Sequence, residues 1–445
     1  MNQQALQPGF AGTPRQRSWL QLMLLVLVYS LILYRVFNIP LYDAGSARDS
    51  IHGDSYSDQN THSAVMYFYD KGFTESAFLP MHNYHSDSLE NPRTGPYTHY
   101  PAFSDVALGL WARTIGSTQP SHLRLLPVLF SLLWFLLIFQ LFAAMLPNQR
   151  AAFIGAAALV LSNYFIAWAD SLHRPMWDEL FKFAGVWLLY DYYTDERRCG
   201  WKLAGIALVL FLAVNTAYDP ALYLAVTVAG FAWVFDRKLF TKETLLLAAA
   251  TLGGFFLHLW QVKLFYGSWE LAIEDLGGAA VYRTTGEATN EVYRNQTAGE
   301  LGREITWVDY LKLPFDWLNR IERFFLFPGW GFVPLALLGL RQLRKEHRQN
   351  FRLALVLLIG SFIWTLVFAQ QTIVHIFNTR HLGLFYGLVI GYGLLSYRTY
   401  VLAHFRQQKW PWMLLHVVFI GYLLAIALSQ QVWDLFVKNG FAWQG

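Results

Sequence analysis

The stretch WLQLMLLVLVYSLILYRVFNIP, from Trp19 to Pro40, decides the fold class of this chain. It is apolar over a length that can cross the ~30 Å hydrocarbon core of a bilayer, which takes roughly 20 helical residues. Arg15 and Arg17 precede it, and the residues near its end do not form the small-residue site of a cleaved signal peptide. We therefore predict a membrane-spanning helix that is retained, with residues 1–18 in the cytoplasm.

The composition of the whole chain supports a membrane protein. Of its 445 residues, 55% are hydrophobic and 14% are charged, whereas a soluble domain carries about 25% charged residues. The aromatic share of 17% is typical of the belts that Trp and Tyr form at membrane interfaces. The net charge of +4 is small and no basic block is present, so we expect no nucleic-acid partner. The single Cys199 excludes an internal disulfide and a Cys-based metal cluster.

Ten further apolar runs predict additional spanning helices, because backbone groups in lipid must form hydrogen bonds within their own segment. They lie at about 122–146, 150–169, 178–194, 202–217, 220–236, 243–265, 327–341, 352–372, 381–397 and 411–430. The sequence thus predicts an all-α polytopic bundle of about 11 transmembrane helices. Its transmembrane domain covers 19–430, and a short outer tail covers 431–445.

Basic residues set the expected orientation of this bundle. They gather in alternate gaps between the apolar runs, and such gaps lie on the cytoplasmic side. Interpreting 97–117 as a span would reverse every later segment and break this pattern. We therefore predict an amphipathic or re-entrant helix there, lying at the outer surface. Two long loops, 40–121 and 266–326, then lie outside, and both are expected to carry amphipathic helices.

Four polar motifs fall at the predicted outer ends of these helices. In chain order they are Ser57-Asp58-Gln59-Asn60-Thr61-His62 with Tyr67 and Gly72 after it, Tyr97-Thr98-His99-Tyr100-Pro101, Arg174-Pro175-Met176-Trp177-Asp178-Glu179, and Asn378-Thr379-Arg380-His381-Leu382. In order and spacing this series resembles the GT-C class of membrane glycosyltransferases. It is most similar to the branch that contains the protein O-mannosyltransferases and the lipid A aminoarabinose transferase. The resemblance covers roughly 40–240 and, more weakly, 370–397.

This resemblance implies that a sugar is transferred from a polyprenyl-phosphate carrier to an acceptor at the outer face of a bacterial inner membrane. The acceptor can be a lipid, a glycan or a protein. Such chemistry requires a carboxylate that accepts the acceptor's proton and cations that stabilise the leaving phosphate. The class has an essential acidic residue in the first outer loop, which predicts Asp58 as the base and Asp54 as its rival. Many relatives have two adjacent acids where this chain has Asp58-Gln59.

The other motif residues are predicted to bind substrate. Arg174 and Arg380 suit the phosphate, because guanidinium groups match phosphate oxygens in a bidentate way. The remaining predicted contacts are His99 and Tyr100 in the Tyr-Pro element, Asp178 and Glu179 beside the acceptor or a metal, and His381. Each prediction has a structural alternative: a carboxylate can cap a helix, an interfacial arginine can snorkel, and His99 can be part of the packing.

No cofactor is expected, with a divalent cation as the alternative. His82, His85 and Asp87 could place ligands on one side of a turn, but a closed zinc site normally has four ligands. Two other functions compete with the enzyme: a transporter or flippase, and a non-catalytic binder of a polyprenyl-linked lipid. A transporter requires charges or broken helices near the bilayer midplane, whereas the charges here gather at the outer ends of the spans.

Overall fold

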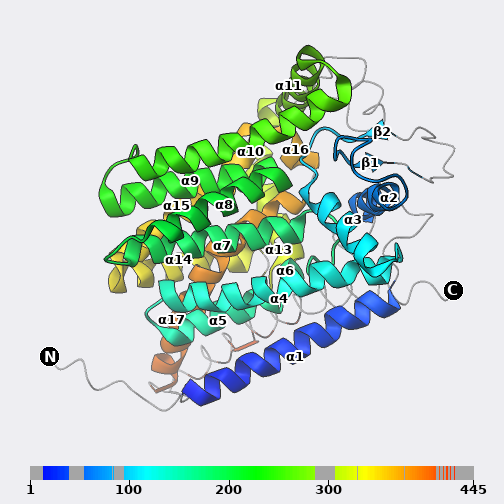
Figure 1. Cartoon of the computed structure of the whole chain (residues 1–445). Coiled ribbons are helices and arrows are strands. Elements are labelled where there is room, and N and C mark those ends of the chain that lie inside the picture. The colour runs from blue at the N-terminus through cyan, green and yellow to red at the C-terminus, as the bar shows by residue number, and fades with distance from the viewer. Residues whose placement is uncertain are drawn as a thin grey trace.

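The computed structural model describes residues 14–39, 55–82, 84, 95–285, 306–327, 329–374 and 376–406, and the single residues 410, 414, 417, 418, 421 and 425. Within these ranges the chain is a bundle of long helices, capped at one end by short elements (Figure 1). The predicted base Asp54, the predicted ligands His85 and Asp87, and most of the predicted span 411–430 lie outside the described residues.

The helices of the bundle run roughly side by side (Figure 1). They are α1 (Pro14–Asn38), α4 (Pro120–Met145), α5 (Gln149–Val160), α7 (Pro175–Thr194), α8 (Gly200–Thr216), α9 (Tyr218–Asp236), α10 (Lys242–Tyr266), α14 (Gly329–Glu346), α15 (Arg348–Val367) and α17 (Gly383–Arg406). The remaining described elements are α2 (Ser55–Lys71), β1 (Met81–His82), β2 (Gly95–Pro96), α3 (Phe103–Ile115), α6 (Asn163–Ile166), α11 (Trp269–Thr285), α13 (Trp307–Phe324), α16 (Ala369–Val374) and the 3-10 helix η1 (Ile376–Leu382).

Five helices among the described residues are long and apolar enough to cross a membrane by length and composition. They are Trp19–Asn38 within α1, together with α4, α9, α10 and α15. The helices α5 and α8 are apolar but shorter. A helical bundle with membrane spans is therefore confirmed, whereas the number of eleven spans is not.

Two predicted spans are broken where the sequence suggested continuous helices. The run 150–169 forms α5, which ends at Val160, and the one-turn helix α6. The hydroxyl of Ser162 donates to the carbonyl of Leu159 at 2.6 Å, so a side chain competes with the helical hydrogen bonds at the break. The run 352–372 is likewise interrupted at Phe368, between α15 and α16. The first break matters most, because the chain after α6 leads directly into the polar residues described below.

The segment 97–117 contains α3, a helix of 13 residues. At 1.5 Å per residue it is about 20 Å long, which is too short to cross the ~30 Å hydrocarbon core. It ends at Gly116, whose φ of 67° is left-handed and suits glycine. With α2 and the two-residue strands β1 and β2, it lies at one end of the bundle (Figure 1). This agrees with the prediction that the segment is not a span.

Glycines bring α5 and α17 into close contact. A Cβ atom added to Gly155 would lie 2.0 Å from the carbonyl oxygen of Gly387, and one added to Gly391 would lie 2.0 Å from that of Ala151. Small residues allow membrane helices to approach so closely. This contact fixes α17, and therefore also the polar η1 segment that precedes it.

We expect Gly391→Ala to lower the melting temperature of the purified protein by several degrees. The added methyl group overpacks the contact between α5 and α17, which typically costs about 1–3 kcal/mol. The matched control is Gly253→Ala in α10, where an added Cβ meets no atom within 4 Å. Thermal unfolding in detergent measures both; equal melting temperatures for the two variants would contradict the close approach.

Candidate functional site

Asp58 lies in the first turn of α2 and its side chain is buried. Its Oδ1 atom accepts a hydrogen bond from the hydroxyl of Ser171 at 2.8 Å and another from the backbone N–H of His173 at 2.7 Å. Both donors belong to the segment between α6 and α7, far away in sequence. The predicted base is therefore held across the fold, which helix capping by itself does not explain.

The ring of His173 continues this contact towards α7. Its Nε2 atom accepts from Nε of Arg174 at 3.2 Å, and its Nδ1 atom lies 3.3 Å from the hydroxyl of Thr61. Burial, and then the charge of Arg174, lower the pKa of His173 well below its usual value. The ring is therefore neutral at physiological pH, as its role as acceptor from Arg174 requires.

Arg380, at the end of η1, lies among three carboxylates. Its Nη2 atom is 2.5 Å from Oδ2 of Asp178 and 2.9 Å from Oδ2 of Asp219, and its Nε atom is 3.2 Å from Oε1 of Glu179. All four side chains are at most 1% exposed. Charges buried so deeply are stable only when they are paired, so Arg380 joins α17 to the first turns of α7 and α9.

Arg174 enters the same cluster from the N-terminus of α7. Its Nη1 atom is 3.1 Å from Oδ1 of Asp219, so this carboxylate contacts both arginines through different oxygen atoms. The guanidinium of Arg174 also lies over the ring of Tyr100, 3.7 Å from its centroid. Cation–π contacts of this kind stabilise a desolvated arginine. They link Tyr100 of the predicted Tyr-Pro element to the charged cluster.

Lys182, about two turns into α7, completes the cluster. Its Nζ atom is 2.6 Å from Oε1 of Glu179 and 2.8 Å from Nδ1 of His381. The Nε2 atom of His381 lies 3.1 Å from Oδ2 of Asp219, and the hydroxyl of Tyr164 donates to Glu179. Arg174, Lys182 and Arg380 thus oppose three carboxylates in one buried ion cluster, which we call the α7–α9 cluster.

The structure brings most of the predicted binding residues together. Tyr100, Arg174, Asp178, Glu179, Arg380 and His381 belong to one connected set of contacts, in which Asp219 joins Arg174 to Arg380 and His381. Sequence reasoning missed Asp219 and Lys182. Asp219 precedes Pro220, which by itself is sufficient to explain the break between two spans, although a carboxylate that opens a span also indicates a polar partner. Lys182 is a charge inside an apolar run, which is a functional signal by itself.

His99 contacts α11. Its Nε2 atom is 3.5 Å from Asp275 of α11, and its carbonyl accepts from Arg283 of the same helix at 3.1 Å. The guanidinium of Arg283 also lies 4.1 Å from the centroid of Tyr100. His99 therefore fastens the first outer loop to α11.

The carboxylates of the cluster do not fit a metal ion as they are arranged. Among the described residues, no group of three or more His, Cys, Asp or Glu side chains is placed to hold one. Asp178 and Asp219 are paired with Arg380, and Glu179 is paired with Lys182, so a cation would have to displace these groups. His82 stacks on Tyr97, with 4.6 Å between ring centroids. We therefore derive no chemical step through a metal.

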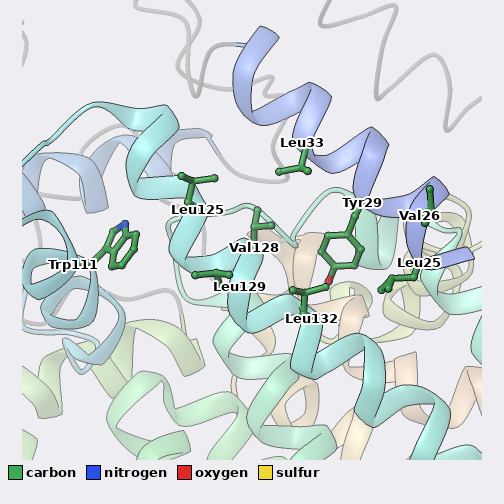
Figure 2. Close-up of a pocket in the computed structure, with 9 residues that line it drawn as sticks. All are labelled: Leu25, Val26, Tyr29, Leu33, Trp111, Leu125, Val128, Leu129 and Leu132. Atoms are coloured by element: carbon green, nitrogen blue, oxygen red, sulfur yellow. The ribbon is translucent and has the colours of Figure 1, made fainter. Parts of the chain in front are cut away.

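An apolar pocket of about 480 Å³ lies between α1 and α4 and is bounded by Trp111 of α3 (Figure 2). Its two polar groups are engaged elsewhere: the hydroxyl of Tyr29 lies 2.9 Å from that of Ser131, and Nε1 of Trp111 donates to the carbonyl of His122 at 3.0 Å. The pocket offers nothing that would hold a phosphate or a sugar. Asp58 and the α7–α9 cluster, by contrast, supply buried charges.

Comparison with known proteins supports the fold. No protein-family model and no curated protein matches the chain. It is similar to the oligosaccharyltransferase of Archaeoglobus fulgidus in the apo form, with a TM-score of 0.52 and 12% identity over 94% of this chain and 56% of that one. The structure of that archaeal enzyme, AglB, with an inhibitory peptide and a dolichol-phosphate gives a TM-score of 0.51 and 11% identity, with the same coverage of 94% and 56%.

A further solved structure, ArnT from Cupriavidus metallidurans in the apo state, gives a TM-score of 0.48 and 14% identity over 87% of this chain and 62% of that one. This chain spans about half the length of the archaeal enzyme, at 56%. Identities this low establish the fold alone. The resemblance to the GT-C class is thus confirmed at the level of architecture.

A further prediction concerns Asp105 in α3, where burial raises the pKa of the carboxyl to about 6 from the usual 3.8. An acid with a raised pKa in the folded state lowers the free energy of unfolding as the pH rises from about 4 to about 6. We expect Asp105→Asn to raise the melting temperature at pH 7.5 by more than at pH 4.5. The corresponding gain in the free energy of unfolding is at most about 3 kcal/mol. Thermal unfolding at both pH values, with the exposed Asp70→Asn as control, measures this; a gain that is larger at pH 4.5 would contradict it.

Proposed function

We propose that this protein is a glycosyltransferase that moves a sugar from a polyprenyl-phosphate carrier to an acceptor hydroxyl at the outer face of the membrane. The observation that carries the proposal is the continuous set of buried contacts from the carboxylate of Asp58, through His173, to the guanidinium of Arg174 and the α7–α9 cluster. It lies in a fold shared with an oligosaccharyltransferase whose structure contains dolichol-phosphate, which is itself a polyprenyl phosphate.

The reaction breaks the bond between the anomeric carbon and the carrier's phosphate oxygen, which keeps the electron pair. A bond forms between the anomeric carbon and the acceptor oxygen, whose proton passes to the carboxylate of Asp58. The hydrogen bonds from Ser171 and from the N–H of His173 fix Oδ1 of this carboxylate. A base that is held in one orientation before the reaction needs no reorganisation during it.

Arg174 and Arg380 would stabilise the negative charge that develops on the leaving phosphate. Both guanidiniums already contact Asp219, which bridges them. A phosphate group must therefore compete with Asp219 for these donors, and its bidentate match to guanidinium favours it in that competition. Arg15 and Arg17, at the start of α1, support an orientation in which this end of the bundle lies outside the cell, and we propose a bacterial inner membrane as the site of action.

We expect Asp58→Asn to slow sugar transfer by about 10²–10⁴-fold, the usual contribution of a positioned base. The amide keeps the shape of the side chain but cannot accept the proton, so binding of polyprenyl phosphate should remain within a few-fold of wild type. The assay follows release of polyprenyl phosphate from a panel of polyprenyl-phosphate hexoses and pentoses in proteoliposomes. Membrane extracts supply the lipid, glycan and protein acceptors.

The control for this experiment is Asp70→Asn, an exposed carboxylate on the same helix whose described partner is Tyr84. If Asp58→Asn transferred sugar at the wild-type rate, Asp58 would not be the base. Wild-type protein that binds every donor and transfers none would instead support a non-catalytic lipid binder. Movement of intact donor across the vesicle membrane would support a flippase.

A second expectation concerns metal ions, because a structure of the archaeal enzyme contains zinc and sulfate. In the present chain the carboxylates of the α7–α9 cluster are paired with arginine and lysine. We therefore expect transfer to be unchanged, within twofold, after dialysis against EDTA. Loss of the rate with EDTA and its recovery on addition of Mg²⁺, Mn²⁺ or Zn²⁺ would show that a cation replaces some of these ion pairs.

A further inference from the structure

A second buried ion cluster lies on the other side of Asp58 and has no part in the reaction as described above. Asp170, between α6 and α7, is 0% exposed and faces two arginines that are 0% and 1% exposed. The Nη2 atom of Arg35 lies 3.6 Å from its Oδ1, and Nη2 of Arg124 contacts its Oδ2. Arg35 comes from the last turn of α1, and Arg124 lies near the start of α4.

The two arginines also bind backbone carbonyls and thereby fasten three segments together. Arg35 donates to the carbonyl of Ile166 in α6 at 2.5 Å. Arg124 donates from Nη1 to the carbonyls of Val36 and Ile39 at 3.2 and 2.8 Å. The C-terminal end of α1, the beginning of α4 and the chain after α6 are therefore held by one set of charge-assisted bonds. Such bonds are stronger than neutral ones and restrict geometry more tightly.

This cluster is joined to the proposed base through adjacent residues. Asp170 directly precedes Ser171, and Ser171 and His173 supply the two hydrogen bonds to Oδ1 of Asp58. Arg35 also interacts electrostatically with Asp58. With Asp58 included, two guanidiniums oppose two carboxylates, so the buried charges balance. The position and the charge of Asp58 thus both depend on this arrangement.

We propose that Asp170, clamped by Arg35 and Arg124, is a positioning residue that sets the orientation of Asp58 for proton transfer. The inference rests on the proposed role of Asp58 as the base. Asp170 itself acts only through Ser171 and His173, because its own oxygens are directed to the two arginines. Loss of the clamp frees the segment 170–173, and a displacement of about 1 Å in a reacting group can cost 10²-fold in rate.

The test is a double-mutant cycle on the full chain in proteoliposomes, with the polyprenyl-phosphate sugar that the wild type uses best. We expect Asp170→Asn to lower kcat by about 10–100-fold while KM for the donor stays within threefold. We expect Asp58→Asn/Asp170→Asn to be no slower than Asp58→Asn, because the clamp has nothing left to position. Independent structural damage would instead multiply the two effects.

The control is Asp236→Asn, which breaks the ion pair between Asp236, at the C-terminal end of α9, and Arg198, in the turn that follows α7. Both positions lie about 30 Å along each helix from the site, and we expect wild-type kcat. If Asp170→Asn is not recovered folded, Arg124→Lys enters the same cycle, because it keeps the charge but loses the guanidinium fork. The proposal is overturned if the two substitutions lower the rate multiplicatively, or if the loss of activity in Asp170→Asn comes from a higher KM for the donor.

The failure of this inference can be distinguished from that of the proposed function. If Asp58→Asn transfers sugar at the wild-type rate, Asp58 is not the base, whatever the result with Asp170→Asn. If Asp58→Asn is impaired but Asp170→Asn has wild-type kinetics, only the positioning role of Asp170 is excluded.

Discussion

Arg380 is buried among Asp178, Glu179 and Asp219, and the arrangement of the helices around the site depends on these pairs. Asp178 and Asp219 stand in the first turns of α7 and α9, Glu179 follows Asp178 directly, and Arg380 stands just before α17. None of these charges is stable in a low-dielectric interior by itself, because removal of one partner of a buried pair typically costs 3–5 kcal/mol. The helices α7, α9 and α17 must therefore meet at this end of the bundle. The glycine contacts allow α17 to approach α5 closely as well.

The segment between α6 and α7 imposes a second constraint on the arrangement of the site. Within five consecutive residues, Asp170 binds α1 and α4 through arginines, Ser171 and His173 hold Asp58, and Arg174 reaches Asp219. The break that ends α5 makes this possible, since a continuous helix would turn these side chains in different directions. One irregular stretch thus connects the proposed base with the proposed phosphate ligands.

Much of the site could be predicted from the sequence, and the exceptions have physical reasons. Asp58 was predicted from the motif series that resembles the GT-C class, and Arg174 and Arg380 were predicted because guanidinium groups match phosphate oxygens. Asp219 was overlooked because the proline after it explained the break in the helix. Lys182 was overlooked because a single charge does not end an apolar run. The contact of His99 with α11 could not be anticipated, since its partner Asp275 is remote in sequence and carries no motif.

The sequence by itself determined that the chain is a helical membrane protein, that 97–117 is not a span, and which end of the bundle carries the polar motifs. These follow from segment length, hydropathy and the placement of charges, all of which are local properties. Only the tertiary structure decided which charges pair, that Asp219 bridges two arginines, and that Asp170 lies next to the residues that hold Asp58. Ion pairs between helices depend on rotation and register across sequence gaps that range, in the two buried clusters, from 45 to 202 residues, and no local pattern encodes them.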